Sequence, residues 1–268
     1  MSGPLRLQFA FAFSGNLWNI ALDDSNGWLV AEVRDATTRR VSFGAVDLQQ
    51  NRLLWKDFSP DPSWWWGIAG LSRGVLLLHQ YTGSQRPETK GILAVEVSTR
   101  RVLWQHPEWA FLRTGGTTLI LHRTGTDQLP VYQITDLLSG QVVALSDAPT
   151  EQQIPPPEPD VQYPRHYSEE SPYFQPITRF LGQQLDIKPL KAIDYAESQG
   201  LIVVSYYLCE AHSPLSNRIL VLDKQARIRL HESVATQLPG IGMDTFLIRK
   251  DSLIFVREKK ELISYALF

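Results

Sequence analysis

The sequence predicts an all-β fold, a five-bladed β-propeller that forms a single domain over residues 1–268. Three observations lead to this prediction. Strand-like segments recur in a fixed order about every 45–50 residues, the last repeat stops one strand short, and the N-terminus carries a spare strand. Repeats of this length, with four strands and turns rich in Gly, Asp, Asn and Ser, are typical of propeller blades. An ordinary antiparallel sandwich is the alternative.

The clearest repeat lies between Gly74 and Gln105, where GVLLLHQY, GILAVEVS and RVLWQ are three expected strands. In the preceding copy, Ala45-Val46-Asp47 aligns with Ala94-Val95-Glu96, and Trp55 aligns with Trp104. The other copies are expected at Thr117–Arg123 with Val131–Leu145, Gly200–Tyr207 with Arg218–Leu230, and Ser252–Glu258 with Glu261–Phe268. An apolar strand precedes each copy, at Leu17–Leu22, Trp64–Gly70, Trp109–Thr114, Leu190–Tyr195 and Met243–Arg249. A complete repeat therefore has four strands, here called a, b, c and d.

The N-terminal segment Leu5–Phe13 alternates apolar residues with polar or small ones, which indicates a strand rather than the apolar core of a signal peptide. The fifth repeat lacks its d strand. We therefore expect Leu5–Phe13 to pair beside Glu261–Phe268 and close the last blade, so that no sheet edge stays free.

Residues 146–189 interrupt the repeats between blades three and four and hold nine of the 17 prolines. Because proline cannot donate to a sheet ladder, the first half is expected to be an extended loop. The second half is expected to form a short helix, with Ser171 as N-cap and Pro172 in the first turn. Its apolar stripe consists of Phe174, Ile177, Phe180 and Leu181. We expect this insertion to act as a lid.

The composition excludes several classes of function. A net charge of −2 lacks the basic excess that nucleic acid or an anionic membrane requires in a partner. The single Cys209 excludes an internal disulfide. No apolar stretch approaches the ~18 residues of a membrane span. We expect a soluble cytoplasmic protein.

Two segments invite a comparison with known families. AVDLQQNRLLW and AVEVSTRRVLW resemble the c–d half of repeats in quinoprotein-like and WD-type (WD40-like) propellers. The chain departs from quinoprotein enzymes because the turn glycine appears only at Gly140 and no cofactor-binding cysteine pair is present. As a whole, the chain resembles an uncharacterised bacterial family of Bacteroidetes type, a domain of unknown function, through AEVRD, LLHQY, PRHYSEE and SYYLCE. That resemblance implies no activity.

Polar residues recur at the ends of the b strands, on the face where the b–c loops and the d–a connections of a propeller emerge together. The insertion is one of these connections, so we expect it to cover a polar pocket on this face. The predicted ligand-binding residues are Glu32, Arg34, Trp65, His79, Tyr81, His122, His166 and Tyr207. The alternative is purely structural, since polar residues normally begin where a strand leaves the core.

The tryptophans suggest two roles. Trp55 and Trp104 are repeat residues and are expected in the core between blades. Trp64-Trp65-Trp66 is expected at the start of an a strand, with Trp64 and Trp66 on one face and Trp65 on the other. Exposed indoles of this kind suit sugars, peptides or planar ligands. Packing of all three between blades is the alternative.

We expect no metal and no cofactor. Glu32, His79, His122 and His166 have suitable chemistry for zinc, but no HxH or HExxH spacing brings a pair together. Neither Ser205 nor Cys209 lies in a nucleophile motif. The sequence favours a binding module for a small-molecule ligand or a protein partner. One alternative is a hydrolase or lyase that uses Glu32, Arg34, His79 and Tyr81; another is a structural protein whose tryptophans dock a partner chain.

Overall fold

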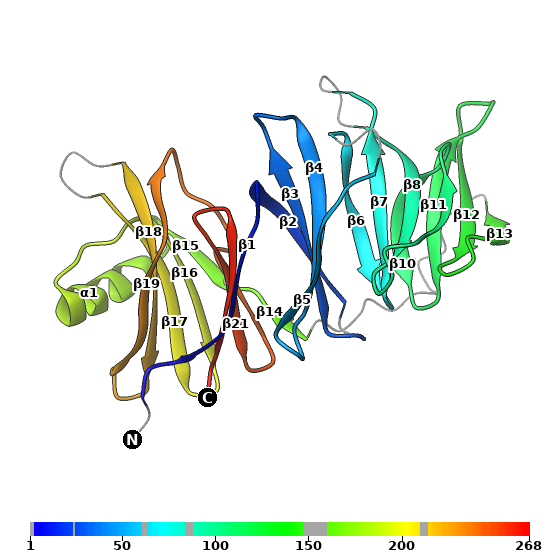
Figure 1. Ribbon diagram of the computed structural model, residues 1–268. Helices are drawn as coiled ribbons and strands as arrows, with labels where there is room; N and C mark the ends of the chain where they lie inside the picture. The colour runs from blue at the N-terminus through cyan, green and yellow to red at the C-terminus, as the bar shows by residue number, and fades with distance from the viewer. Residues whose placement is uncertain (1–2, 24, 61–63, 84–87, 147–159, 210–213) are drawn as a thin grey trace. The chain divides into compact units, whose positions relative to one another are not determined.

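The computed structural model describes residues 3–23, 25–60, 64–83, 88–146, 160–209 and 214–268. The chain divides into an N-terminal unit, Phe13–Pro159, and a C-terminal unit, Met1–Ala12 together with Asp160–Phe268. In the described residues, the strands form five antiparallel sheets of four or five strands, and one helix accompanies them (Figure 1). The predicted all-β class is confirmed.

The N-terminal unit contains three four-stranded sheets whose strand order follows the chain order. Sheet 1 consists of β2 (Asn16–Asp23), β3 (Trp28–Asp35), β4 (Arg40–Asp47) and β5 (Arg52–Phe58). Sheet 2 consists of β6 (Trp66–Ser72), β7 (Val75–Tyr81), β8 (Thr89–Glu96) and β9 (Val102–His106). Sheet 3 consists of β10 (Ala110–Gly115), β11 (Thr118–Thr124), β12 (Pro130–Asp136) and β13 (Val142–Ser146). The predicted four-strand repeat is therefore present in each sheet.

In the N-terminal unit, an acidic residue at the end of each c strand shapes the turn that follows. Oδ1 of Asp47 accepts hydrogen bonds from the backbone N–H of Gln49 at 3.0 Å and of Gln50 at 2.9 Å. The fourth residue after the acid adopts a left-handed conformation, with φ of 51° at Asn51, 62° at Arg100 and 70° at Gly140. The turn thus needs a positive φ rather than a glycine. Asn51 and Arg100 supply it in two of the turns, and glycine occupies the position only at Gly140.

The two repeat tryptophans join neighbouring sheets of the N-terminal unit. Nε1 of Trp55 donates to the carbonyl of Val97 at 2.6 Å, and Nε1 of Trp104 donates to the carbonyl of Leu137 at 2.9 Å. Each indole thereby leaves the d strand of one sheet and reaches the residue that follows the c strand of the next. The predicted location of both tryptophans in the core between sheets is confirmed.

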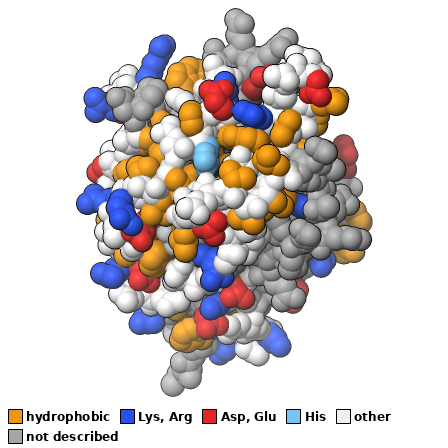
Figure 2. Space-filling view, turned by 90° about the vertical axis from the view of Figure 1, so that its right-hand side faces the viewer, with side chains coloured by type: hydrophobic (Ala, Val, Ile, Leu, Met, Phe, Trp, Pro, Cys, Tyr) orange, Lys and Arg blue, Asp and Glu red, His pale blue; other side chains and the backbone are white. Residues whose placement is uncertain are grey.

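Ala144 takes the corresponding position in sheet 3, opposite Ile134. Without the indole, the outer strand β13 keeps Val142, Val143 and Leu145 exposed. Figure 2 looks at the side of the N-terminal unit that carries β13, and hydrophobic side chains are spread over it among charged ones.

The C-terminal unit contains two five-stranded sheets. Sheet 4 consists of β15 (Arg165–Ser168), β16 (Leu190–Ser198), β17 (Leu201–Leu208), β18 (Leu215–Asp223) and β19 (Ile228–Leu238). Sheet 5 consists of β1 (Arg6–Ala12), β22 (Glu261–Ala266), β21 (Ser252–Arg257), β20 (Phe246–Arg249) and β14 (Val161–Gln162). β1 pairs antiparallel with β22, and Arg6 lies opposite Ala266. The predicted pairing of the N-terminal strand with the last strand is confirmed.

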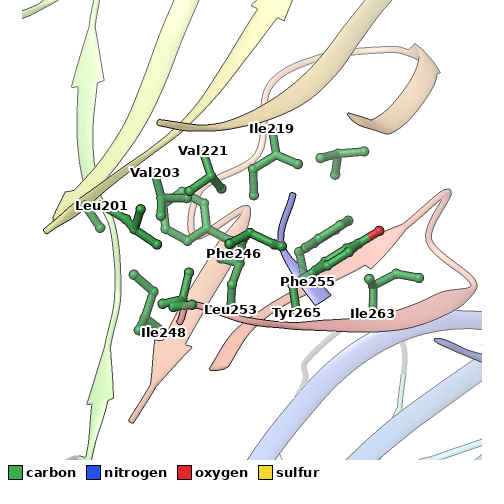
Figure 3. Close-up of a cluster of buried hydrophobic side chains, with 14 residues drawn as sticks. Leu201, Val203, Ile219, Val221, Phe246, Ile248, Leu253, Phe255, Ile263 and Tyr265 are labelled. Atoms are coloured by element: carbon green, nitrogen blue, oxygen red, sulfur yellow. The ribbon is translucent and has the colours of Figure 1, made fainter. Parts of the chain in front are cut away.

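Sheets 4 and 5 share an apolar core, which Figure 3 shows in close-up. Val203 and Val221 of sheet 4 point toward Phe246 and Phe255 of sheet 5, and Ile263 extends the cluster along β22. These side chains are almost fully buried. Each contributes about 1.5–3 kcal/mol through burial, so the core accounts for the cohesion of this unit.

The predicted lid is wrong for residues 160–189. β14 and β15 are edge strands of sheets 5 and 4 rather than parts of an extended loop. The helix α1 (Phe174–Leu185) is present, and it buries Phe174 and Leu181 against sheet 4. Its N-cap is Tyr173 rather than Ser171, and no side chain caps it. Residues 147–159, the most proline-rich part of the insertion, lie outside the described residues. No helix in the described part of the chain is long and apolar enough to cross a membrane.

Candidate functional site

Two adjoining hollows open on the N-terminal unit, where the β7–β8 loop and the β9–β10 connection emerge. The first has a volume of about 480 Å³ and is lined by Trp65, Gln80, Tyr81, Thr82, Lys90 and Glu108, among others. The second has a volume of about 580 Å³ and is lined by Thr89, His122, Arg123 and Thr124, together with Thr82, Lys90 and Glu108 from the first. We call them the Trp65 hollow and the His122 hollow. Loops b–c and connections d–a thus share one end of the unit, as expected for these sheets.

Aromatic rings and charged groups alternate in the Trp65 hollow. Trp65 and Tyr81 are half-buried, so each presents part of its ring. Nζ of Lys90 and Oε2 of Glu108 form an ion pair at 2.9 Å, and both side chains are largely exposed. An exposed pair of this kind contributes little stability. Its charges are therefore available to a ligand at the boundary between the hollows.

Glu32 and Arg34 hold the backbone that carries Trp65. Arg34 donates from Nη1 to the carbonyl of Trp64 at 3.1 Å and from Nη2 to the carbonyl of Trp66 at 2.8 Å. The backbone N–H of Tyr81 donates to the carbonyl of Trp65 at 2.8 Å. Three consecutive carbonyls are thereby held, so the backbone that carries Trp65 is ordered before any ligand arrives.

Glu32 is buried and orients the arginine. Its Oε1 accepts from Nε of Arg34 at 2.6 Å, and its Oε2 accepts from the backbone N–H of Ile68 at 3.0 Å. Both carboxylate oxygens thus have a donor, as a buried charge requires. The guanidinium of Arg34 also lies 5.3 Å from the centre of the Trp64 ring. These two residues support the hollow without lining it.

His79 lies beneath Tyr81. The centres of their rings are 4.7 Å apart and the ring planes meet at 77°. Nε2 of His79 is buried and has no hydrogen-bond partner within the described residues. Burial, and then the positive charge of Arg34, lower the pKa of His79 to about 4, so the imidazole is neutral at pH 7. Gly67 provides the space, because a Cβ there would lie 3.0 Å from Nε2.

The predicted strand alternation across Trp64-Trp65-Trp66 is wrong. β6 begins at Trp66, and the two preceding tryptophans lie in the turn before it. Trp66 is buried in the core between sheets 1 and 2, Trp64 packs against Arg34, and Trp65 enters the hollow. A turn lets three adjacent indoles take three environments, which a regular strand does not allow.

His122 lines the second hollow, as its position at the end of β11 predicted. Its ring centre lies 6.5 Å from that of Tyr132. The adjacent Arg123 places its guanidinium 4.7 Å from the centre of the Trp109 ring. Trp65, Tyr81 and His122 are therefore the predicted residues that line the hollows.

His166 and Tyr207 belong to the C-terminal unit, where both make structural contacts. Nδ1 of His166 lies 2.7 Å from Oδ1 of Asp194, which is 1% exposed. Oδ2 of Asp194 accepts from the backbone N–H and the hydroxyl of Thr245, at 3.0 and 2.8 Å. The hydroxyl of Tyr207 accepts from the backbone N–H of Gly242 at 2.8 Å, and burial raises its pKa. These contacts join sheet 4 to the segment that precedes β20.

Sequence patterns did not reveal Lys90, Glu108 or Asp194. Lys90 and Glu108 come from different segments, and they meet because β8 pairs with β9, where Ile92 lies opposite His106. Asp194 is 28 positions from His166 and meets it only through the β15–β16 pairing. Among the described residues, no three His, Cys, Asp or Glu side chains form a group that could hold a metal ion.

The chain was compared with family models, curated proteins and solved structures. Residues 22–104, fewer than half of the chain, match the family model of a domain of unknown function, DUF4905. The search of curated proteins found no match. Three of the solved structures that match are each only 9–11% identical to this chain.

BamB from Moraxella catarrhalis is 9% identical over 99% of this chain and 92% of that one, with a TM-score of 0.34. The β-propeller domain of the trilobed protease from Pyrococcus furiosus is 11% identical over 91% of this chain, which spans 64% of that structure, with a TM-score of 0.32. Raptor from Chaetomium thermophilum is 10% identical over 98% of this chain and 29% of that one, with a TM-score of 0.31. Scores this low carry no argument about function.

Proposed function

We propose that this chain is a binding module whose ligand occupies the Trp65 and His122 hollows. The observation that carries the proposal is the fixed backbone under Trp65, where Arg34 and the N–H of Tyr81 hold three consecutive carbonyls. A backbone that is already ordered under an indole lowers the entropic cost of binding a ligand to that residue. Preformed concave sites with aromatic rings and a few polar groups are typical of ligand pockets.

The lining favours a small polar ligand with one apolar face, as a sugar ring has. Trp65 and Tyr81 offer ring surface. Gln80, Lys90 and Glu108 offer donors and acceptors for hydroxyl groups. The two hollows meet at Thr82, Lys90 and Glu108, so a ligand of more than one ring can extend from Trp65 toward His122.

The alternative enzyme lacks support in these contacts. It required Glu32, Arg34, His79 and Tyr81 as acid–base and anion-holding groups. Glu32 is buried with both oxygens engaged, and Arg34 is held by the carboxylate and two carbonyls. Such groups position other residues rather than react.

Binding to a panel of neutral and acidic oligosaccharides, followed by tryptophan fluorescence and calorimetry, tests the proposal. We expect at least one to bind, and Trp65→Ala to weaken it by about tenfold or more, the loss typical of a central aromatic contact. Leu138→Ala is the control, because Leu138 belongs to the same unit, is 63% exposed and lines neither hollow. No binding by any oligosaccharide, or equal loss in both variants, would overturn the proposal.

A closed ring of five blades stays the architecture that we propose for the five sheets. The chain-order meanders of sheets 1 to 3 and the pairing of β1 with β22 support it. A single compact body of 268 residues has a radius of gyration of about 18 Å. A clearly larger value in small-angle scattering would argue against the ring. Cytoplasmic location and bacterial origin stay predictions.

A further inference from the structure

Four of the nine tyrosines lie on one surface of the C-terminal unit. Tyr163 and Tyr173 are 53% and 61% exposed, and Tyr167 and Tyr195 are half-buried. The ring centre of Tyr167 is 5.1 Å from that of Tyr173 and 6.4 Å from that of Tyr195. Tyr163, Tyr167 and Tyr195 line a groove of about 460 Å³, here called the tyrosine groove, and Tyr173 packs against Tyr167 beside it.

The pairing of β15 with β16 produces this surface. Arg165 lies opposite Tyr195, so the alternating residues Arg165, Tyr167, Tyr195 and Glu197 share one face of sheet 4. α1 covers the neighbouring part of this face with Phe174 and Leu181. The groove is the part that the helix leaves open, next to Tyr173 at its N-terminus.

Hydrogen bonds keep the groove rigid. The hydroxyl of Tyr195 donates to Oε1 of Glu197 at 2.5 Å, and Nε2 of Gln162 donates to the carbonyl of Glu197 at 3.2 Å. Burial, and then the bond to Glu197, raise the pKa of Tyr195. A surface fixed in this way loses little conformational entropy on binding.

We propose that the tyrosine groove binds a proline-rich segment of a partner protein in the polyproline II conformation. Tyrosine rings pack against pyrrolidine rings, and phenol hydroxyls donate to backbone carbonyls. A polyproline II helix leaves those carbonyls unpaired and has little conformational freedom to lose. Grooves lined by aromatic rings are a recurring solution for this ligand.

The spacing of the rings fits this ligand. Two residues of a polyproline II helix advance about 6 Å, and the successive ring centres are 5.1 and 6.4 Å apart. A polyproline II segment that lies over the rings can therefore place residues two apart on neighbouring rings.

The charges at the groove favour a peptide over a simple anion. Arg165 and Glu197 are both exposed, and both line the groove. Their charges sum to zero, but the positive charge of Arg165 and the negative charge of Glu197 lie at different positions in the groove. A polyproline II segment can bind in either direction, because its side chains project with near-equal spacing both ways. An acidic residue at one end of the peptide and a basic residue at the other would select one direction by pairing with Arg165 and Glu197.

The test uses a fluorescein-labelled peptide of alternating Ala and Pro and a Gly–Ser peptide of the same length. Fluorescence anisotropy with the full chain should show saturable binding of the first and none of the second. Tyr167→Ala should weaken binding by about tenfold or more. Tyr163→Ala and Tyr173→Ala remove exposed rings, so they should weaken binding while the unfolding midpoint stays unchanged.

Tyr81→Ala is the matched control, because Tyr81 lines the Trp65 hollow and not the tyrosine groove. It should leave peptide binding intact, whereas Tyr167→Ala should leave oligosaccharide binding intact. The proposal for the two hollows and the proposal for the tyrosine groove can therefore be refuted independently. Equal binding of the Gly–Ser peptide, no binding of the Ala–Pro peptide at millimolar concentration, or unchanged binding by the folded Tyr163, Tyr167 and Tyr173 variants would overturn the inference.

Discussion

Replacing His79 with glutamine should make the protein more resistant to mild acid. His79 is half-buried beneath Tyr81, and its pKa falls from 6.5 to about 4 because of burial and the charge of Arg34. In the unfolded chain the imidazole is solvated and binds a proton below about pH 6.5. Between these two pKa values the unfolded state therefore binds more protons than the folded state.

The sign and size of the effect follow from this difference. Stability rises with pH wherever the unfolded state binds more protons. The contribution of His79 is thus complete above pH 6.5 and is lost as the pH falls toward 4. A shift from 6.5 to about 4 corresponds to roughly 3 kcal/mol. Because the side chain is only half-buried, solvent screening reduces this to about 1–2 kcal/mol.

Urea unfolding of the wild type and of His79→Gln at pH 7.5, 6.5, 5.5 and 4.5 measures the effect. The free energy of unfolding of the wild type should fall by about 1–2 kcal/mol more than that of the variant between the first and last pH. The comparison must be a difference, since burial and Arg218 also lower the pKa of His231 and add a slope to both proteins. Parallel curves for the two proteins would refute the burial argument for His79.

Three further substitutions test the turns and the contacts between sheets, each by urea unfolding. Gly140→Ala should lower the free energy of unfolding by about 2–4 kcal/mol, because φ is 70° there and a Cβ would overlap the ring of Trp104; a change below 1 kcal/mol would contradict it. Trp104→Phe should cost about 1–3 kcal/mol, because the carbonyl of Leu137 loses its donor; a neutral result would show that water replaces the indole. Arg100→Gly should stabilise by up to about 1 kcal/mol, because this exposed residue has a φ of 62°; a loss of stability would contradict the strain.

Local patterns were sufficient to predict the repeated strands and their order. Alternation along Leu7, Phe9 and Phe11 predicted β1, and the missing last strand predicted its pairing with β22. The same repeat aligned Trp55 with Trp104, and both indoles make the same contact with the next sheet. Equivalent residues of a repeat occupy equivalent positions in neighbouring sheets. Aligning two repeats therefore predicts the same contact in both.

Local patterns failed where distant segments decide the structure. Proline content suggested that residues 160–168 form a loop, yet β14 and β15 pair at sheet edges, where a neighbouring Pro164 costs no internal hydrogen bond. The tryptophan run suggested a strand, yet Arg34 holds it as a turn from another sheet. In both cases the partner that determines the conformation lies far away in the sequence.

The structural and functional interpretations of the polar strand ends are complementary rather than exclusive. Glu32 and Asp194 are both buried carboxylates, and each accepts a backbone N–H that belongs to or precedes the first strand of the next sheet, at Ile68 and Thr245. Removing either would leave its cationic or polar partners without an acceptor and destabilise the sheet contact. Loss of binding in such variants would therefore say nothing about a ligand. Only lining residues outside the core, such as the half-buried Trp65 and the exposed Tyr163, separate recognition from folding.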